Sequence, residues 1–242
     1  MEGITEYLQV DTKIETHQLV ESTNILAKKQ AEGGAKHGTV IIAEEQTAGR
    51  GRHGRSFFSP PGHGIYMSLI LKPSNPSLTT IQAAVAVCEA TEQACKKSPQ
   101  IKWVNDLFMR QKKICGISAE MDQTMQWVVV GIGVNFTLPD NVPNELSHII
   151  GAVFEGEEPN TTRNQLTASI INKILHPNYS QAEMIERYKQ RLFILGKKIR
   201  VESAITPYEA IALDIDDMGQ LLIEDEFGER KLLSAGEVSV RF

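Results

Sequence analysis

The chain has 242 residues, 41% of them hydrophobic and 23% charged, and a formal net charge of −5. This composition is ordinary for one large globular domain with a small second one, and it argues against disordered and collagen-like chains. No apolar run approaches the ~20 residues of a membrane-spanning helix, and the N-terminal segment does not resemble a signal peptide. We therefore expect a cytoplasmic protein with no membrane contact. The acidic balance also disfavours a dedicated nucleic-acid-binding protein.

The three cysteines, Cys88, Cys95 and Cys115, cannot form a disulfide framework. Cys88 and Cys95 would lie ~10.5 Å apart along one helix, which exceeds the reach of a disulfide. The sequence also has no CxxC motif and no His/Cys cluster with zinc-ligand spacing. It therefore predicts reduced cysteines in the core and no protein-held metal site.

Residues 1–136 alternate between strands and helices after a polar N-terminal stretch. Predicted strands are short apolar or β-branched runs at 14–21, 38–45, 65–71, 101–104, 113–121 and 126–136. One helix is predicted from Ser22 to about Glu32, because the side-chain oxygens of Ser22 or Thr23 can cap it. A second, rich in alanine, is predicted from 77 to 97.

The second half of the chain changes character at Gly196. A Pro/Asn/Glu-rich stretch at 138–162 leads to predicted helices at 163–175 and 180–194. After Gly196, five short runs alternate polar and apolar residues, which is typical of a small SH3-like β-barrel. The sequence thus predicts an α+β fold, in which a mixed sheet flanked by helices at 1–195 precedes a C-terminal barrel at 196–242.

The loop GRGRHGR at 49–55 contains the spacing G-x-G-x-x-G. It does not open a dinucleotide-binding fold, because SFFSPPG follows where a helix is required and no acidic residue lies ~20 positions on. Its glycines give mobility, and Arg50, Arg52 and Arg55 supply cations suited to phosphate and carboxylate oxygens. Taken alone, the loop could also be a solvated basic turn or an RGG-like RNA-binding segment.

Further motifs stand in order around this loop. They are STN at 22–24, Gln46, KWVND at 102–106, KKICGI at 112–117 and GIGVN at 131–135. The set resembles the biotin–protein ligases, whose hallmarks are similar to STN, GRGR(R)GR, KWPND, K(I/L)AGI and G-x-G-x-N. The resemblance covers residues 14–242. His53, Phe57, Val104 and Cys115 depart from the pattern, but none of these changes removes an essential functional group.

This resemblance implies a fold, a reaction and a set of partners. The fold would be the class II synthetase-like catalytic domain with a small C-terminal barrel. The reaction would use Mg²⁺ and ATP to convert biotin to biotinyl-5′-AMP. It would then transfer biotin to a lysine of the biotin carboxyl carrier protein domain of a biotin-dependent carboxylase. Specific DNA binding is not expected, because STN already appears at residue 22, and homodimerisation is left open. The alternatives are a lipoate–protein ligase and a non-enzymatic nucleotide- or RNA-binding protein.

The resemblance also assigns roles to individual residues. It implies catalytic roles for Lys113, Arg52 and Asp106. The implied biotin-binding residues are Ser22, Thr23, Asn24, Gln46, Arg50, Gly51, Arg52, Lys113 and Gly116. The implied ATP-binding residues are Arg50, Arg52, Arg55, Phe57, Trp103, Asn105, Lys113, Gly131, Gly133 and Asn135.

Each role has a plainer alternative. Core packing could explain Trp103 and Phe57, and turn chemistry alone could explain Asn105 and Asp106. Lys112 should face away from Lys113, because side chains alternate along a strand.

Arg52 yields a prediction from the sequence alone. A mixed anhydride hydrolyses in water, so the loop must cover it, and only an anion-binding side chain offsets the ~1–2 kcal/mol per residue of ordering. Arg52→Gly should therefore still form adenylate but release it, and so label lysines of added serum albumin. A streptavidin blot of wild type and variant with biotin and ATP measures this. If the variant makes adenylate but releases none, the covering role passes to Arg50 or Arg55.

Overall fold

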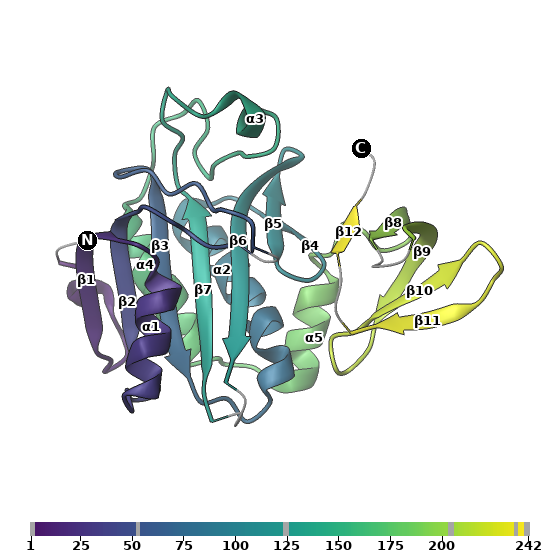
Figure 1. Ribbon diagram of the computed structural model, residues 1–242, viewed down its shortest axis with the longest axis horizontal. Coiled ribbons are helices and arrows are strands. Elements are labelled where there is room, and N and C mark those ends of the chain that lie inside the picture. The colour runs from purple at the N-terminus through teal and green to yellow at the C-terminus, as the bar shows by residue number, and fades with distance from the viewer. Residues whose placement is uncertain (1–2, 52–53, 123–125, 203–205, 235–236, 240–242) are drawn as a thin grey trace.

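A seven-stranded mixed sheet forms the centre of the computed structural model, which describes residues 3–51, 54–122, 126–202, 206–234 and 237–239. Its strand order is β1-β2-β3-β7-β6-β5-β4 (Figure 1). Only the β1–β2 pair is parallel among the described pairs. The central strands are the apolar, β-branched runs of the sequence. The strands are β1 (Ile14–Val20), β2 (Val40–Gln46), β3 (Gly64–Leu71), β4 (Gln100–Lys102), β5 (Asp106–Met109), β6 (Lys112–Met121) and β7 (Val128–Asn135).

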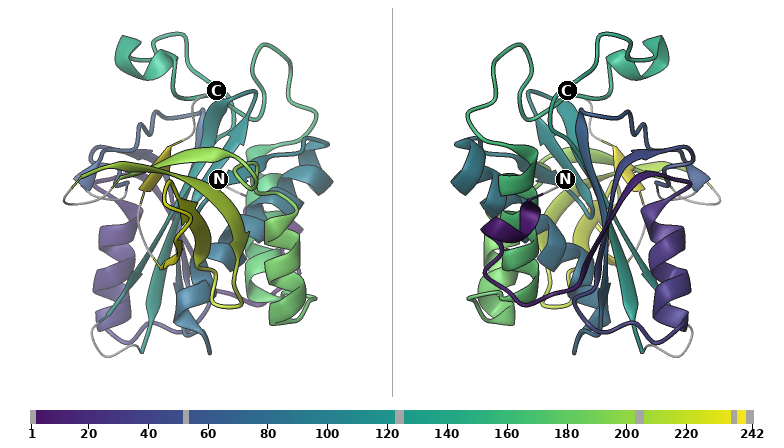
Figure 2. Two further views of the ribbon diagram at one scale, coloured as in Figure 1. Left: turned by 90° about the vertical axis from the view of Figure 1, so that its right-hand side faces the viewer. Right: turned by 90° about the vertical axis from the view of Figure 1, so that its left-hand side faces the viewer.

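Helices cover both faces of this sheet (Figure 2). Helix α1 (Thr23–Glu32) lies on one face, against β2, β3 and β7. On the other face lie α2 (Thr79–Cys95), α4 (Arg163–Leu175) and α5 (Gln181–Lys189). Capping boxes, Thr162 with Gln165 and Ser180 with Glu183, start the last two helices. Short helical turns are η1 (Ile4–Tyr7), η3 (Pro76–Leu78) and α3 (Asn144–Ser147).

The two faces carry cores of different size, because alternate residues of a strand point to opposite sides. On β7, Val128, Val130, Ile132 and Val134 belong to the large core shared with α2. Val129 instead belongs to a small core with α1. Further along this α1-facing row come Gly131 and Gly133. Between Val129 and Asn135, this row of β7 therefore places no side chain on the α1 side of the sheet.

A second, five-stranded antiparallel sheet follows, as predicted for the C-terminal part. Its order is β11-β10-β9-β8-β12. The strands are β8 (Lys198–Glu202), β9 (Tyr208–Ile215), β10 (Leu221–Asp225), β11 (Arg230–Leu233) and β12 (Glu237–Ser239). The exact division at 195/196 stays a prediction.

A turn of this second sheet docks on the first. Trp103 is 2% exposed, and its Nε1 donates a hydrogen bond of 3.0 Å to the carbonyl of Gly219. Gly219 has a φ of +78°, and a Cβ there would lie 2.2 Å from Ile81 on α2. Only glycine fits this turn against the helix.

Several element ends differ from the sequence prediction by one or two residues, and two regions differ in their structure. The strand predicted at 101–104 ends at Lys102, and the unpredicted β5 follows it. The helix predicted to reach 194 ends at Lys189, and Ile101 pairs through its backbone groups with the turn segment that follows the helix. Its N–H donates to the Arg191 carbonyl at 2.8 Å, and its carbonyl accepts from Phe193 at 3.2 Å.

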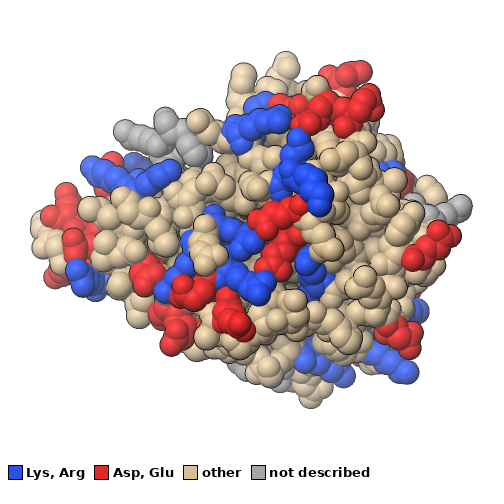
Figure 3. Space-filling view, turned by 180° about the vertical axis from the view of Figure 1, so that it is seen from behind, with Lys and Arg blue, Asp and Glu red and all other residues tan. Residues whose placement is uncertain are grey.

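Several surface and core properties can also be read from the described residues. All three cysteines are buried and free, as predicted. Among the described residues, no helix combines the length and apolarity needed to cross a membrane. On the face seen in Figure 3, basic and acidic side chains lie interspersed.

The docking contact of Trp103 gives a stability prediction. Trp103→Phe removes the indole N–H, leaves the buried Gly219 carbonyl unpaired and opens a gap, so it should lower the free energy of unfolding by about 2–4 kcal/mol. Trp127→Phe is the matched control, because Trp127 is only partly buried at the edge of the small core. Urea unfolding followed by circular dichroism measures both. Equal losses would show that the docking contact contributes nothing special.

Candidate functional site

A cavity lies on the α1 side of the sheet, beyond the small core. It joins residues from α1, β2, the loop after β2, β6 and β7. Most of the predicted site residues line it: Ser22, Thr23, Asn24, Gln46, Arg50, Gly51, Phe57, Asn105, Lys113, Gly116, Gly131 and Gly133. Met67, Ile117, Ser118 and Ile132 also line it, and the sequence did not single them out.

Glycines form the floor of this cavity. A Cβ on Gly131 would lie 2.2 Å from Asn24 Oδ1, and one on Gly133 would lie 2.5 Å from a ring carbon of Phe57. A Cβ on Gly116 would lie 3.2 Å from Lys113 Nζ and 3.3 Å from Phe57. Any larger residue at Gly131 or Gly133 would displace these side chains. The G-x-G spacing therefore lets polar and aromatic groups lie flat on the sheet.

The N-terminus of α1 supplies the polar end of the cavity. Ser22 occupies the N-cap position, but its side chain makes no capping hydrogen bond. The predicted capping role of Ser22 is therefore wrong, and its hydroxyl lines the cavity instead. Gln46 Oε1 accepts from the Thr23 backbone N–H at 2.9 Å, and Gln46 Nε2 donates to Ser59 Oγ at 2.9 Å.

Asn24 is held by groups that the sequence analysis missed. Its Nδ2 donates to Ser118 Oγ at 3.0 Å and to Glu120 Oε1 at 3.1 Å. Glu120 also forms an ion pair with Lys28, one turn along α1 from Asn24. The signal was present in the sequence, because Ser118 and Glu120 continue the row of Gly116 at a spacing of two residues.

The opposite end of the cavity carries Lys113. Its Nζ lies 2.7 Å from Asp106 Oδ1, so these two predicted catalytic residues form an ion pair. Backbone hydrogen bonds of 2.9 Å to Ile149 and Gly151 fix the main chain of Lys113.

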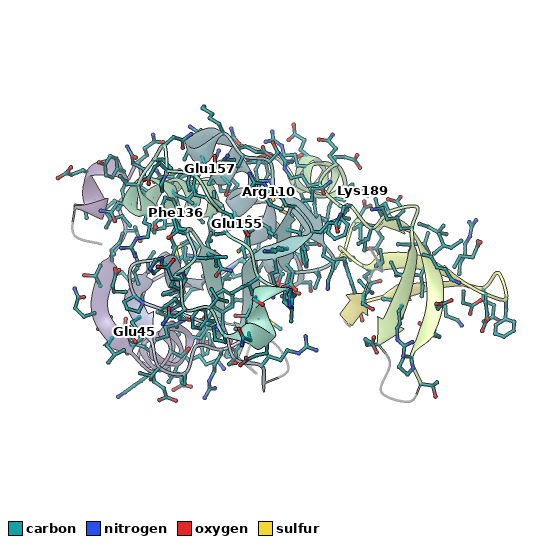
Figure 4. All side chains as sticks on the ribbon, turned by 90° about the horizontal axis from the view of Figure 1, so that it is seen from above. Glu45, Arg110, Phe136, Glu155, Glu157 and Lys189 are labelled. Carbon is teal, nitrogen blue, oxygen red and sulfur yellow. The ribbon has the colours of Figure 1, made fainter. Side chains whose placement is uncertain are left out.

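Lys112 instead pairs with Glu155 at 2.9 Å. In Figure 4, Glu155 lies close to Glu157 and Arg110. The predicted opposite facing of Lys112 and Lys113 is therefore confirmed.

Phe57 covers the glycine floor. Its ring contacts Tyr66 edge-on, with 6.4 Å between centroids, and Ser59 Oγ donates to its backbone carbonyl at 2.9 Å. Burial raises the pKa of the Tyr66 phenol well above its usual range, so the hydroxyl stays protonated and donates to the Pro60 carbonyl at 2.8 Å. With Phe57 in place the cavity holds about 40 Å³.

A second cavity of about 680 Å³ adjoins the first and shares Arg50, Gly51 and Asn105 with it. Arg55 lines this second cavity. Asn105 Nδ2 donates to the Ile117 carbonyl at 2.8 Å and to Asp106 Oδ1 at 3.0 Å. Of the predicted phosphate-binding arginines, Arg50 thus lines both cavities and Arg55 lines the second.

Three predicted site residues that the structure describes, Trp103, Asp106 and Asn135, line neither cavity. Trp103 is buried in the core, and its indole N–H donates to the Gly219 carbonyl. The structure therefore favours core packing for Trp103 over the predicted contact with ATP. Asn135 is 7% exposed and donates to the Gly151 carbonyl at 2.9 Å, which ties β7 to the chain before α4. Arg52 lies outside the described residues, as does His53.

A larger cavity of about 870 Å³ lies on the other side of the sheet, between η1, α2 and α4. None of the predicted site residues lines it. The glycine-floored cavity and its neighbour are therefore the candidate site.

Comparison with known proteins agrees with this placement. Residues 16–135 match the Biotin/lipoate A/B protein ligase family, and residues 194–241 match the Biotin protein ligase C terminal domain. The bifunctional ligase/repressor BirA of Bacillus subtilis is 33% identical over 90% of this chain and 71% of its own length. The biotin--[acetyl-CoA-carboxylase] ligase of Mycobacterium tuberculosis is 30% identical over 90% of this chain and 85% of its own.

Solved structures extend the likeness to the fold. The biotin protein ligase of Aquifex aeolicus, in complex with biotin and ATP, covers 95% of this chain and 98% of its own length. It is 25% identical in sequence and has a TM-score of 0.80. Sequence relatives and fold thus point the same way, and this chain belongs to the Biotin/lipoate A/B protein ligase family, as one of its biotin protein ligases.

Proposed function

We propose that this protein joins biotin to ATP as biotinyl-5′-AMP and transfers the biotinyl group to a lysine of a biotin carboxyl carrier protein domain. The observation that carries the proposal is the polarity of the cavity. One end has hydroxyl and amide groups on a glycine floor, and the other has Lys113. Biotin has the matching polarity, with a ureido ring at one end and a carboxylate at the other.

The ureido ring would bind at the N-terminus of α1. It offers N–H donors and a carbonyl acceptor, which suit the side chains of Ser22, Thr23 and Gln46. The apolar part of biotin would lie between the glycine floor and Phe57. Because a volume of ~40 Å³ holds only about three waters, the Phe57 ring must move off the floor when the bicyclic ring enters.

Lys113 would act where the carboxylate meets the α-phosphate. Two anions react there, so a fixed cation stabilises the charge that develops. In the ligand-free site Asp106 neutralises Lys113 at 2.7 Å. When substrate oxygens take over Lys113, Asp106 would become free to accept a proton from the carrier lysine, whose free pKa is ~10.4.

The phosphates of ATP would lie in the adjoining cavity. Arg50 and Arg55 line it, and Arg52 belongs to the same loop. The described residues include no cluster of three or more His, Cys, Asp or Glu side chains that could hold a metal ion. Mg²⁺ would therefore arrive with ATP, because it is commonly held by substrate phosphates and one or two carboxylates.

Other roles follow from the proposal. The carrier is expected to belong to a biotin-dependent carboxylase, the protein to act in the cytoplasm, and specific DNA binding to be absent. A lipoate ligase is the alternative, but lipoate has no ureido group. It would offer the hydroxyl and amide groups at this end of the cavity no ureido N–H or carbonyl to pair with.

The first test is pyrophosphate release from Mg-ATP. Biotin should support release, whereas lipoate and octanoate should not, because neither can pair with the polar end of the cavity. The measurement is a coupled pyrophosphate assay with each acid at equal concentration. Equal rates with lipoate would move the assignment to the lipoate ligases.

The second test compares two neighbouring lysines. Lys113→Ala removes a charge-assisted contact worth roughly 1.5–3 kcal/mol, so adenylation should slow by about 10–150-fold. Lys112→Ala is the matched control, because Lys112 points to Glu155 instead of the cavity. Single-turnover formation of biotinyl-5′-AMP gives both rates. The cationic role of Lys113 would be ruled out by a larger loss in the Lys112 variant.

A further inference from the structure

A buried serine lies beneath the polar end of the cavity. Ser68 on β3 is 0% exposed, and its Oγ lies 2.6 Å from Asn24 Oδ1 and 2.8 Å from Thr23 Oγ1. A hydroxyl has one hydrogen to donate. The contact that receives this hydrogen therefore decides which group Thr23 presents to the cavity.

Glu120 settles the orientation of Asn24. Its Oε2 is paired with Lys28, and its Oε1 lies 3.1 Å from Asn24 Nδ2. An ionised carboxylate only accepts hydrogen bonds, so the amide nitrogen of Asn24 must face Glu120. The amide oxygen of Asn24 then faces Ser68.

The direction of the remaining bonds follows. Asn24 Oδ1 can only accept, so Ser68 donates its hydrogen there, at 2.6 Å. The 2.8 Å contact with Thr23 then requires the Thr23 hydroxyl to donate to Ser68. The 3.2 Å separation of Thr23 Oγ1 from Gln46 Oε1 is long for an O–H···O bond. Gln46 Oε1 already accepts from the Thr23 backbone N–H.

This series of hydrogen bonds uses the hydroxyl hydrogen of Thr23, so Thr23 Oγ1 has no hydrogen to donate into the cavity. Among the described residues, none donates to it once its own hydrogen is given to Ser68, so its lone pairs face the ligand. We propose that Ser68 is a positioning residue, which makes Thr23 a fixed hydrogen-bond acceptor for a ring N–H of the ureido group. The proposal rests on the proposed function. A ligand N–H can donate a hydrogen bond to Thr23 Oγ1, whereas a ligand oxygen at the same position would be repelled by the lone pairs of Thr23 Oγ1.

Ser68→Ala tests the proposal, because it frees the Thr23 hydroxyl to turn its hydrogen toward the cavity. The two substrates are biotin and its cyclic carbamate analogue, in which a ring oxygen replaces the N–H that faces Thr23. The variant should raise the KM for biotin ~10-fold, equivalent to about 1.4 kcal/mol, with kcat and the KM for ATP close to wild type. The ratio of kcat/KM for biotin to that for the carbamate should fall ~10-fold or more.

The ratio separates positioning from general damage. A merely structural defect lowers kcat/KM for both substrates and leaves their ratio unchanged, which would overturn the proposal. Thr91→Val is the matched control, because it removes another fully buried hydroxyl, bonded to the Val87 carbonyl at 2.8 Å on α2. It should leave the KM for biotin unchanged. Ser68→Thr keeps a hydroxyl and should keep the ratio near wild type.

Two further outcomes are decisive. If Ser68→Ala does not fold, Glu120→Ala takes its place, since it lets the Asn24 amide turn without touching the core. The same ratio should then fall by a smaller factor, and an unchanged ratio would overturn the proposal. Absence of biotin turnover by the wild type would contradict the proposed function itself, and the positioning role would fall with it.

Discussion

The alternation of side chains along β7, and along β6 beyond the register shift at Ile114, is the constraint on which the site depends. The same two strands must fill a large core on one face and leave room for a ligand on the other. Isoleucine and valine occupy the core-facing positions of β7, and Gly131 and Gly133 occupy two positions opposite them. A shift of register by one residue would bury the glycines and fill the cavity with aliphatic side chains. Packing of the large core and the shape of the cavity therefore both depend on the register of β6 and β7.

The pairing of these strands also fixes the orientation of the polar side chains in the cavity. Gly131 lets Asn24 lie against the sheet, where Ser68, Ser118 and Glu120 reach it from two strands. At the other end, the backbone hydrogen bonds of Lys113 fix its place beside Asp106. The site is thus prepared before any ligand arrives, which reduces the entropy lost on binding. Phe57 is the exception, because its ring covers the glycine floor of the cavity.

Much of this was predictable from the sequence. Apolar runs located the six predicted strands, and helical spacing with capping residues located the four main helices. The ordered motifs contain most of the residues that line the cavity. The motifs contain residues expected to contact a ligand directly. Ser68 and Glu120 instead contact the side chains of Thr23 and Asn24, so no motif includes them. Their roles depend on which strands become neighbours, and that pairing joins residues far apart in the chain.

Trp103 shows the opposite failure. It belongs to a ligand-site motif, but a large ring with one N–H is equally suited to a buried position with one acceptor, and the sequence could not choose between them. The acceptor is Gly219, more than a hundred positions away. The boundary of α5 was missed for a similar reason, because its last predicted turn is used to pair with Ile101.

The four residues from Trp103 to Asp106 connect the C-terminal sheet to the residues of the candidate site. Trp103 is attached to the turn at Gly219, and the Val104 carbonyl accepts from the Tyr188 hydroxyl at 2.9 Å. The next residue, Asn105, lines the cavity, and Asp106 contacts Lys113. Four consecutive residues therefore connect the C-terminal sheet to the ion pair of Lys113 and Asp106. A fragment ending before the small sheet would keep the sequence motifs of the candidate site but would lose the Gly219 carbonyl that holds Trp103 in place.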